Sequence, residues 1–401
     1  MIARVAAALA LAAALAAASA AAGIGSPELR AKLSAALAAP GIGPGRTGAV
    51  ALDLASGRVV YAHNATVPFV PASNEKLPVT YAALVVLGPS FRFPTEVRGQ
   101  GSLAADGTWT GSLVLKGYGD PTLSSARLAQ LARQLARLGL RRVTGGVVGD
   151  ESFFDRRRTA PGWKPSFSMV ESPPLSALVV DRAVTRGRIA RLPAYAAAKR
   201  FRRELREVGV DVAGPASVGA GGGRLLASTE SKPLGEILHA VDADSDNFTA
   251  ELLLKELGAV AGAGGTSAAG AAVVRRVLGE AGIPLAGVRI VDGSGLSSLD
   301  RLTPQAIVDI LARVWHAPHL RPYLVDALAV AGRTGTLAHR LTSPLTLGKV
   351  IGKTGTTDLA CVLSGFVRGR YAFSVIENGT PVPFWTAREA QDRFVQLLAQ
   401  S

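Results

Sequence analysis

Three short motifs place a serine, two lysines and an amide side chain in an order that could carry out nucleophilic catalysis. They are S-x-x-K with Ser73 and Lys76, S-x-N with Ser245 and Asn247, and K-T-G with Lys353, Thr354 and Gly355. Each motif alone occurs by chance in many chains of this length. The ordered set, with each motif in a suitable local context, indicates a serine nucleophile with a lysine as its base.

The first motif pairs a nucleophile with a base. Serine is a weak nucleophile until another group takes its proton. Residues i and i+3 of a helix lie on one face, so Ser73 and Lys76 are expected to approach each other. Lys76 can act as a base only if its pKa falls through burial and nearby positive charge, which Lys353 could supply. A helix N-terminus favours negative charge, so a position there would further favour loss of the serine proton.

The second motif offers a hydroxyl and an amide. Ser245 could relay a proton between Lys76 and the leaving group, and Asn247 has both a donor and an acceptor for a peptide amide. Ser245 and Asp246 could also simply begin a helix as its N-cap. The capping role and the catalytic role are compatible.

The third motif is expected on an edge strand beside the substrate. There Lys353 and Thr354 could bind a substrate carboxylate, and Gly355 leaves room for the substrate backbone. The backbone N–H groups of Ser73 and Thr356 are the expected oxyanion hole. The alternative is a plain turn between two strands. A phosphate-binding loop is excluded, because one glycine precedes the lysine and no helix follows.

No other residue set competes with these motifs. His316 and His319 have a spacing that could ligate a metal, but Pro318 separates them and no carboxylate or cysteine joins them. The chain has no G-x-S-x-G elbow and no evident Ser/His/Asp triad. We therefore expect neither a metal nor a cofactor.

The surrounding pattern predicts an α/β (α+β) fold. Apolar runs on both sides of Ser56-Gly57 predict a hairpin. A helix should follow Ser73 and end at Gly88, with an irregular first turn because Pro78 removes a helical hydrogen bond. Other helices are predicted at 27–38, 124–138, 195–208, 233–240, 247–257, 266–281, 304–315 and 385–399, and late strands at 347–354, 360–367 and 371–377.

Strands near both ends of the chain, with helices between them, predict one sheet that is built from both ends. Residues 23–94 and 228–401 would then form a split catalytic domain, and 95–227 a strand-rich inserted domain. Residues 1–22 have the pattern of a secretory signal peptide, with Arg4, an apolar stretch and Ala18-Ser19-Ala20. The protein is thus expected to be exported to the periplasm, the cell envelope or the medium. An uncleaved, weak membrane anchor is the alternative.

Composition adds broad limits. The 401 residues are 48% hydrophobic and carry a net charge of +14, which fits a globular protein with a basic surface. The basic clusters are scattered and no nucleic-acid motif is present, so we expect no nucleic acid and at most weak association with an acidic envelope. The single cysteine, Cys361, lies in an apolar run and is expected in the core.

The motifs and their flanking segments resemble the class C penicillin-binding proteins, the D-alanyl-D-alanine carboxypeptidase/endopeptidase family. The resemblance runs from about residue 30 to the C-terminus. It is carried by PASNEKL at 71–77, GYGDPTL at 117–123, GDESFFD at 149–155, PPLSALVVDR at 173–182, SDNFTAELLLKELG at 245–258, DGSGLSSLDRLTP at 292–304 and AGRTGTLAHRL at 331–341.

The resemblance implies a penicillin-binding, transpeptidase-like domain with an antiparallel sheet flanked by helices. It implies Ser73 as the nucleophile, Lys76 as the base, Ser245 and Asn247 as proton relay and substrate holder, and Lys353 as carboxylate partner. The implied activity is a serine DD-peptidase that acts on D-Ala-D-Ala or D-Ala cross-links in stem peptides of peptidoglycan. It proceeds through an acyl-enzyme and is inhibited by β-lactams.

Two departures from the family pattern matter. Members usually carry two insertions between the first two motifs, but here 245 minus 73 leaves only 172 residues, so the second insertion is apparently absent. Many members also have acidic residues three or four places after the tryptophan that matches Trp163, where this chain has Ser166 and Phe167. We therefore expect weak preference for a substrate side chain that ends in a free ammonium group.

Three alternatives remain at this point. A serine β-lactamase would share the acylating residues, although we see no base for its deacylating water. A non-catalytic envelope-binding protein could keep the fold, against which the intact motifs argue. A polyanion-binding module would rest on charge alone. The sequence does not indicate the oligomeric state.

Overall fold

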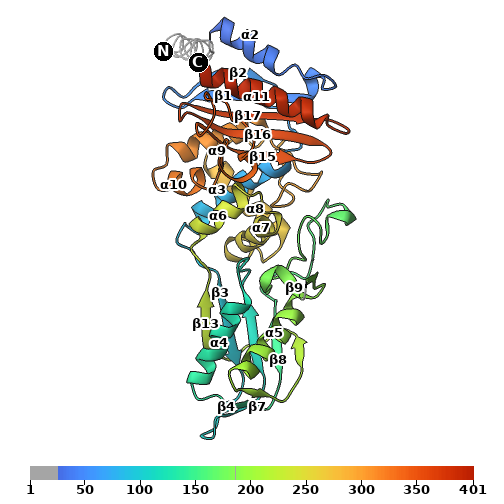
Figure 1. The fold of residues 1–401 in the computed structure, drawn as a ribbon, viewed down its shortest axis with the longest axis vertical. Helices are drawn as coiled ribbons and strands as arrows, with labels where there is room; N and C mark the ends of the chain where they lie inside the picture. Colours follow the sequence, from blue (N-terminus) through green and yellow to red (C-terminus); the bar gives the residue numbers. More distant parts are fainter. Residues whose placement is uncertain (1–25, 186) are drawn as a thin grey trace, which may run out of the picture.

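The main sheet is built from both ends of the chain. The computed structural model describes residues 26–185 and 187–401. Six antiparallel strands follow the order β14-β15-β16-β17-β1-β2 (Figure 1). They are β1 (Thr47–Asp53), β2 (Arg58–His63), β14 (Ala329–Val330), β15 (Val350–Thr356), β16 (Ala360–Val367) and β17 (Tyr371–Asn378).

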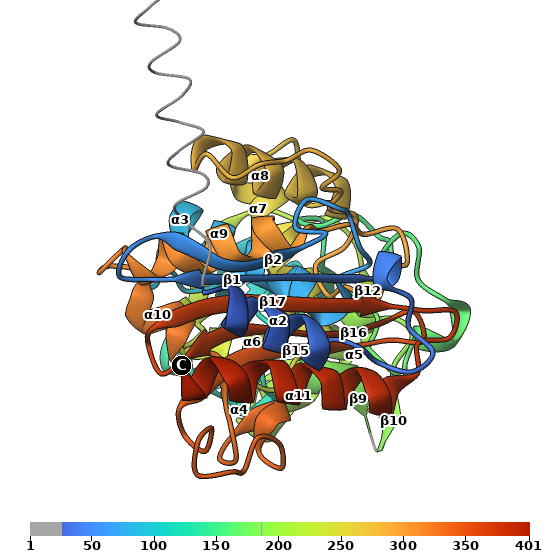
Figure 2. The ribbon, with the colours of Figure 1, turned by 90° about the horizontal axis from the view of Figure 1, so that it is seen from above.

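Helices cover both faces of this sheet. Two helices from opposite ends of the chain, α2 and α11, lie on one face, and the helices from the middle of the chain lie on the other (Figure 2). The central strands β16 and β17 are therefore buried on both faces, and most of their residues are apolar. The helices are α2 (Pro27–Ala36), α3 (Lys76–Val86), α6 (Leu234–Asp242), α7 (Asn247–Ala261), α8 (Ser267–Glu280), α9 (Pro304–Trp315), α10 (Arg321–Val325) and α11 (Phe384–Gln400).

The segment between β3 (Pro94–Gly99) and β13 (Arg224–Glu230) forms a lobe that extends away from the main sheet (Figure 1). These two strands pair with each other, so the chain enters and leaves the lobe side by side. The lobe has its own hydrophobic core around Trp109 and Phe201. We propose that it is the inserted domain, which we call the inserted lobe.

Two mixed sheets and two helices make up most of the inserted lobe. The sheets have the orders β12-β8-β6-β3-β13 and β11-β7-β5-β4, and a small hairpin pairs β9 with β10. The remaining elements are β4 (Ser102–Leu103), β5 (Thr108–Thr110), β6 (Leu113–Gly117), α4 (Ser125–Arg137), β7 (Arg142–Val143), β8 (Val147–Asp150), β9 (Val184–Thr185), β10 (Arg188–Ile189), α5 (Pro193–Glu207), β11 (Asp211–Val212) and β12 (Ala216–Val218).

The predicted fold class is confirmed, and most predicted elements lie where the sequence places them. The third-last strand begins at Val350 instead of 347, because Thr346 and Leu347 form a turn whose amides bond back to Ser343. Two short elements, α10 and β14, were not predicted, because segments of five and two residues carry too little periodicity. Cys361 is buried in the core, as expected.

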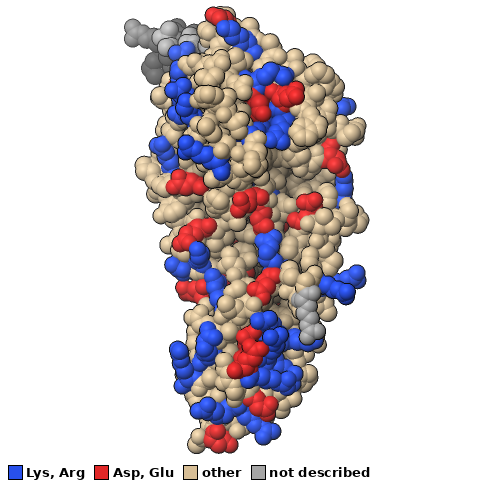
Figure 3. Space-filling model, in the orientation of Figure 1, with Lys and Arg blue, Asp and Glu red and all other residues tan. Residues whose placement is uncertain are grey.

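Charge is dispersed over the surface. Figure 3 shows basic and acidic side chains mixed over the face in view, with many Lys and Arg side chains over the inserted lobe. The expected signal peptide lies outside the described residues. Within 26–185 and 187–401, no helix is both long and apolar enough to cross a membrane.

Candidate active site

Ser73 lies on a tight turn that joins the main sheet to helix α3. The turn is a 3₁₀ helix, η2 (Ala72–Glu75), that precedes α3, so the predicted irregular first turn is present. Ala72 has a φ of 45°, and a Cβ on the facing Gly295 would lie 1.8 Å from the Ala72 carbonyl oxygen. Asn74 Nδ2 donates to the Lys353 carbonyl oxygen at 3.2 Å. These contacts fix the serine beside strand β15.

Lys76 is fully buried behind the serine. Its Nζ donates to Ser73 Oγ at 3.2 Å, to Asn247 Oδ1 at 2.8 Å and to the Ser294 carbonyl oxygen at 2.6 Å. Burial lowers the pKa of Lys76 to about 8, although carboxylates led by Asp292 act in the opposite direction. A lysine with such a pKa is partly neutral near pH 8 and can take a proton from the hydroxyl.

A buried acidic cluster lies behind Lys76. It consists of Glu75, Glu251, Asp292 and Asp300, which are all fully buried. Neither carboxylate oxygen of Glu75 has a hydrogen-bond partner, and among the described residues none of the four forms an ion pair within 4.0 Å. Burial and the neighbouring Asp292 raise the pKa of Glu75, Glu251 and Asp300. Burial therefore favours the neutral form of these three carboxyl groups, and the pKa of Glu251 is raised to about 8.

The S-D-N segment turns sharply beside both lysines. Ser245 has a φ of 62°, and α7 starts two residues later with Asp246 as its N-cap. Ser245 Oγ accepts from Lys353 Nζ at 2.8 Å, whereas Asn247 accepts from Lys76. We expected Ser245 to relay a proton between Lys76 and the leaving group; in the structure its hydroxyl contacts the other lysine, Lys353. The N-cap and the site contacts coexist, as the sequence allowed.

Strand β15 carries the K-T-G motif at the side of the turn. Lys353 is fully buried, and burial together with the Lys76 charge lowers its pKa well below the usual range. Thr354 Oγ1 donates to Thr336 Oγ1 at 2.8 Å, so Thr336 joins the site. A Cβ on Gly355 would lie 3.0 Å from the Ser73 amide nitrogen. Thr356, at the end of the strand, is exposed.

The inserted lobe also reaches the site, which the motifs did not reveal. Asn247 Nδ2 donates to the Glu171 carbonyl oxygen at 3.2 Å. Trp163 Nε1 donates to Asp292 Oδ2 at 2.8 Å, so the lobe also contacts the buried acidic cluster. The only sequence signal for these contacts was the resemblance of the flanking segments.

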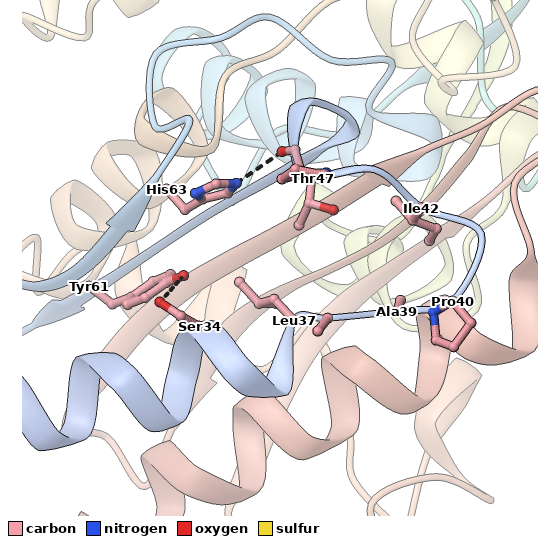
Figure 4. Close-up of a pocket in the computed structure, with 10 residues that line it drawn as sticks. Ser34, Leu37, Ala39, Pro40, Ile42, Thr47, Tyr61 and His63 are labelled. Atoms are coloured by element: carbon pink, nitrogen blue, oxygen red, sulfur yellow. Dashed lines mark hydrogen bonds between the residues drawn. The ribbon is translucent and has the colours of Figure 1, made fainter.

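A groove elsewhere on the molecule lacks comparable chemistry. It has a volume of about 670 Å³ and lies beside β2, at the sheet edge opposite β14 and β15 (Figure 4). Apolar residues such as Leu37 and Ile42 line it, two of its polar side chains, Ser34 and Tyr61, bond to each other at 3.2 Å, and His63 bonds to the Pro44 carbonyl oxygen at 2.9 Å. His316 and His319 likewise do not join the site, and the described part of the chain holds no cluster of His, Cys, Asp or Glu suited to a metal.

Convergence of S-x-x-K, S-x-N and K-T-G beside a helix-covered antiparallel sheet defines the class of serine enzymes that penicillin acylates. Comparison with known families gives the particular group. The model of the D-Ala-D-Ala carboxypeptidase 3 (S13) family matches residues 29–192 and 187–401. The chain belongs to this family, and it is a serine peptidase of the D-alanyl-D-alanine carboxypeptidase type.

Several relatives align with most of the chain. The D-alanyl-D-alanine carboxypeptidase of Actinomadura sp. (strain R39) is 31% identical over 88% of this chain and 81% of its own length. Carboxypeptidase DacB of Mycolicibacterium smegmatis is 32% identical over 86% of this chain and 78% of its own length. Penicillin-binding protein 4 of Haemophilus influenzae has the same fold, with a TM-score of 0.80 at 24% identity over 92% of this chain and 98% of that chain.

Proposed function

We propose that Ser73 is the nucleophile of this peptidase and that Lys76 is its general base. The observation that carries this proposal is the 3.2 Å contact between Lys76 Nζ and Ser73 Oγ, made by a fully buried lysine whose pKa is lowered to about 8. Positioning of the pair by η2 and α3 gives the amine direct access to the hydroxyl proton.

In the proposed reaction, Ser73 Oγ attacks the carbonyl carbon of the penultimate D-Ala while Lys76 takes the hydroxyl proton. The backbone N–H groups of Ser73 and Thr356 stabilise the oxyanion. When the peptide bond breaks, Lys76 passes the proton that it took from Ser73 through Ser245 to the departing amine. An ester on Ser73 remains. Water then hydrolyses the ester and returns the proton to Ser73.

The proposed substrate is a peptidoglycan stem peptide that ends in D-Ala-D-Ala or is cross-linked through D-Ala. Asn247 holds the peptide amide, and Lys353 with Thr354 holds the terminal carboxylate. Lys353 is within 2.8 Å of Ser245 Oγ, so the carboxylate site adjoins the proposed proton relay. β-Lactams would acylate the same serine. We propose that the enzyme acts outside the cytoplasm, after removal of residues 1–22.

The first prediction tests the nucleophile. Penicillin should add one covalent adduct, which peptide mapping by mass spectrometry locates on the peptide that contains Ser73. Ser73→Ala should abolish both the adduct and release of D-Ala from a D-Ala-D-Ala peptide. Ser245→Ala serves as the matched variant, because it should slow acylation yet keep the adduct on Ser73. An adduct that persists in Ser73→Ala would refute the assignment.

Two further assays define the activity. Turnover of penicillin should be slow beside turnover of a D-Ala-D-Ala peptide; the reverse order would indicate a β-lactamase. Digestion of purified cell wall, with the products separated by chromatography, would measure release of D-Ala against cleavage of cross-links. Loss of both products with intact penicillin binding would leave only an envelope-binding role.

A further inference from the structure

The residue between Ser245 and Asn247 is held by an arginine from the inserted lobe. Arg182 Nη2 donates to Asp246 Oδ2 at 2.7 Å, and the other carboxylate oxygen accepts from the Thr249 amide at 2.7 Å. The Arg182 guanidinium also lies over the Phe248 ring, 5.0 Å from its centroid. One side chain of the inserted lobe therefore contacts the S-D-N turn and the first turn of α7.

Arg182 sits on a backbone segment with an uncommon conformation. Asp181, Arg182 and Ala183 have φ values of 49°, 54° and 61°. Left-handed backbone at non-glycine residues costs free energy and persists only where the surroundings fix it. Here the Asp181 carboxylate accepts from the Ser125 amide at 3.0 Å and from Ser125 Oγ at 2.6 Å, at the start of α4. The segment is thus anchored within the lobe while its arginine points to the catalytic domain.

We propose that Arg182 is a positioning residue of the active site, which fixes and neutralises Asp246 so that Ser245 and Asn247 meet the two catalytic lysines. Ser245 reaches Lys353 and Asn247 reaches Lys76, both at 2.8 Å, from the two sides of Asp246. The Glu171 carbonyl, also from the lobe, accepts from Asn247 at 3.2 Å. The inserted lobe therefore supports the second motif at two points.

A role confined to overall stability does not explain this arrangement. The Arg182 and Asp246 side chains are 44% and 19% exposed, and ion pairs with that exposure contribute little to stability. Their position matters for a different reason. The turn they hold carries two groups that must lie within hydrogen-bond distance of buried amines, and small displacements there reduce rates strongly.

The pair also affects the charge on Lys76. Burial opposes ionisation of Asp246, but the hydrogen bond and charge of Arg182, together with the hydrogen bonds from Thr249, outweigh it and hold the pKa of Asp246 below its usual value. The Asp246 carboxylate is one of the charges that raise the pKa of Lys76. Loss of Arg182 would leave that carboxylate without its cation. The titratable groups that face Lys76 from its surroundings are Glu75, Asp242, Asp246, Glu251, Asp292 and Lys353.

The test measures the rate of Ser73 acylation by penicillin between pH 5 and 10 in four variants of the full chain. The acid limb of the pH–rate profile is the range in which the rate rises as Lys76 loses its proton. Arg182→Gln should lower the rate at pH 7 by about 10-fold or more. It should also move the acid limb to higher pH by about half a unit, because loss of the cation raises the pKa of Lys76. Asp246→Asn should move the limb to lower pH, because it removes the negative charge while Asn still caps α7. The double variant should have its limb near the wild-type position. Arg182→Lys, which keeps the charge, should restore the limb but not the full rate.

Arg188→Gln is the matched control, since Arg188 is an exposed arginine of the same lobe on β10; it should leave rate and limb unchanged. The proposal is overturned if Arg182→Gln keeps the wild-type limb, or if its rate falls only in step with a fall in melting temperature. If Arg182→Gln does not fold, Asp246→Asn alone decides, and an unmoved limb then overturns the proposal. The inference rests on the proposed roles of Ser73 and Lys76, and a wild-type protein without an adduct on Ser73 would refute those roles instead.

Discussion

Lys76 joins three parts of the chain through one amine. The oxygens that it contacts belong to Ser73 on η2, Asn247 at the start of α7 and Ser294 in the loop after α8. A neutral lysine amine can still donate two hydrogens and accept one, so it can hold two of these oxygens and take the serine proton. Burial that removes water from the amine is what makes the neutral form accessible.

The second prediction follows at the scale of this residue. Lys76→Arg should slow acylation of Ser73 by roughly 10²–10⁴-fold at neutral pH, because arginine stays protonated in proteins and cannot act as a base. The measurement is the rate of penicillin adduct formation. Lys349→Arg is the control, since Lys349 is exposed at the turn before β15. Near-normal acylation by Lys76→Arg would show that Lys76 acts only as a fixed charge.

At the scale of whole elements, the turn η2 packs directly against strand β15. Asn74 bonds to the strand backbone, and Gly355 of that strand faces the amide of Ser73. The strand can approach the nucleophile only because position 355 has no side chain. The nucleophile and the proposed carboxylate site are thus held in register by direct packing of a turn on a strand.

The third prediction tests that register. Gly355→Ala would place a methyl group 3.0 Å from the Ser73 nitrogen and 3.1 Å from Ala72 Cβ. We expect Ser73 to shift by a few tenths of an ångström and acylation to fall by about 10-fold or more. The melting temperature should change little, because Gly355 does not have a positive φ. Gly45→Ala, where an added Cβ meets no atom within 4 Å, is the control. Unchanged acylation in Gly355→Ala would contradict the packing argument.

At the scale of the whole molecule, buried carboxyl groups connect stability with pH. Glu377 lies at the end of β17, where Gln391 of α11 donates to it at 2.9 Å, and it is fully buried. Burial raises its pKa to about 8, although a hydrogen bond from Gln391 and the charge of Arg340 oppose this. In the unfolded chain the pKa of a glutamate is about 4.3. As pH rises between these values, the unfolded state ionises while the native state must keep its proton, so stability falls.

The fourth prediction uses this linkage. Glu377→Gln should stabilise the protein at pH 8 by on the order of 1–3 kcal/mol, and the gain should shrink toward pH 5. Thermal unfolding followed by calorimetry at both pH values is the measurement. Glu389→Gln on α11, where the side chain is 71% exposed, should change neither value. A gain that is equal at both pH values would show that ionisation of Glu377 is not its cause.

At the same scale, we propose that the inserted lobe and the catalytic domain together decide which substrate side chains fit. Ser166 and Phe167 form part of a short 3₁₀ helix, η3 (Pro165–Phe167), and offer no carboxylate. The nearby Asp358 is already paired with Lys164. Glu171 lies beside the site, with its carbonyl on Asn247 and its side chain exposed.

The fifth prediction concerns selectivity. Two D-Ala-D-Ala peptides that differ only in a free or acetylated side-chain amine should have similar kcat/KM values. An unpaired ammonium that enters a partly dry pocket loses hydration without compensation. The acetylated peptide serves as the control substrate. A strong preference for the free amine that Glu171→Gln abolishes would contradict the prediction and identify Glu171 as the ammonium partner.

Sequence by itself determined the parts of this protein that depend on local pattern. The periodicity of α7 and of the late strands predicted their positions within a few residues, because a helix or strand is specified by side chains close together in the chain. The S-x-x-K spacing predicted that Ser73 and Lys76 approach each other, because residues three apart lie on one helix face. The resemblance of flanking segments supplied the family.

Only the tertiary structure decided which partners each group has. Lys76 bonds to Ser294, which lies 218 residues away in the chain, and Ser245 pairs with Lys353 instead of Lys76. Arg182 reaches Asp246 from the inserted lobe, and Glu75 is buried without a hydrogen-bond partner among residues 26–185 and 187–401. Local periodicity does not encode such contacts, because they form only when distant segments close into one packed core and lose their water.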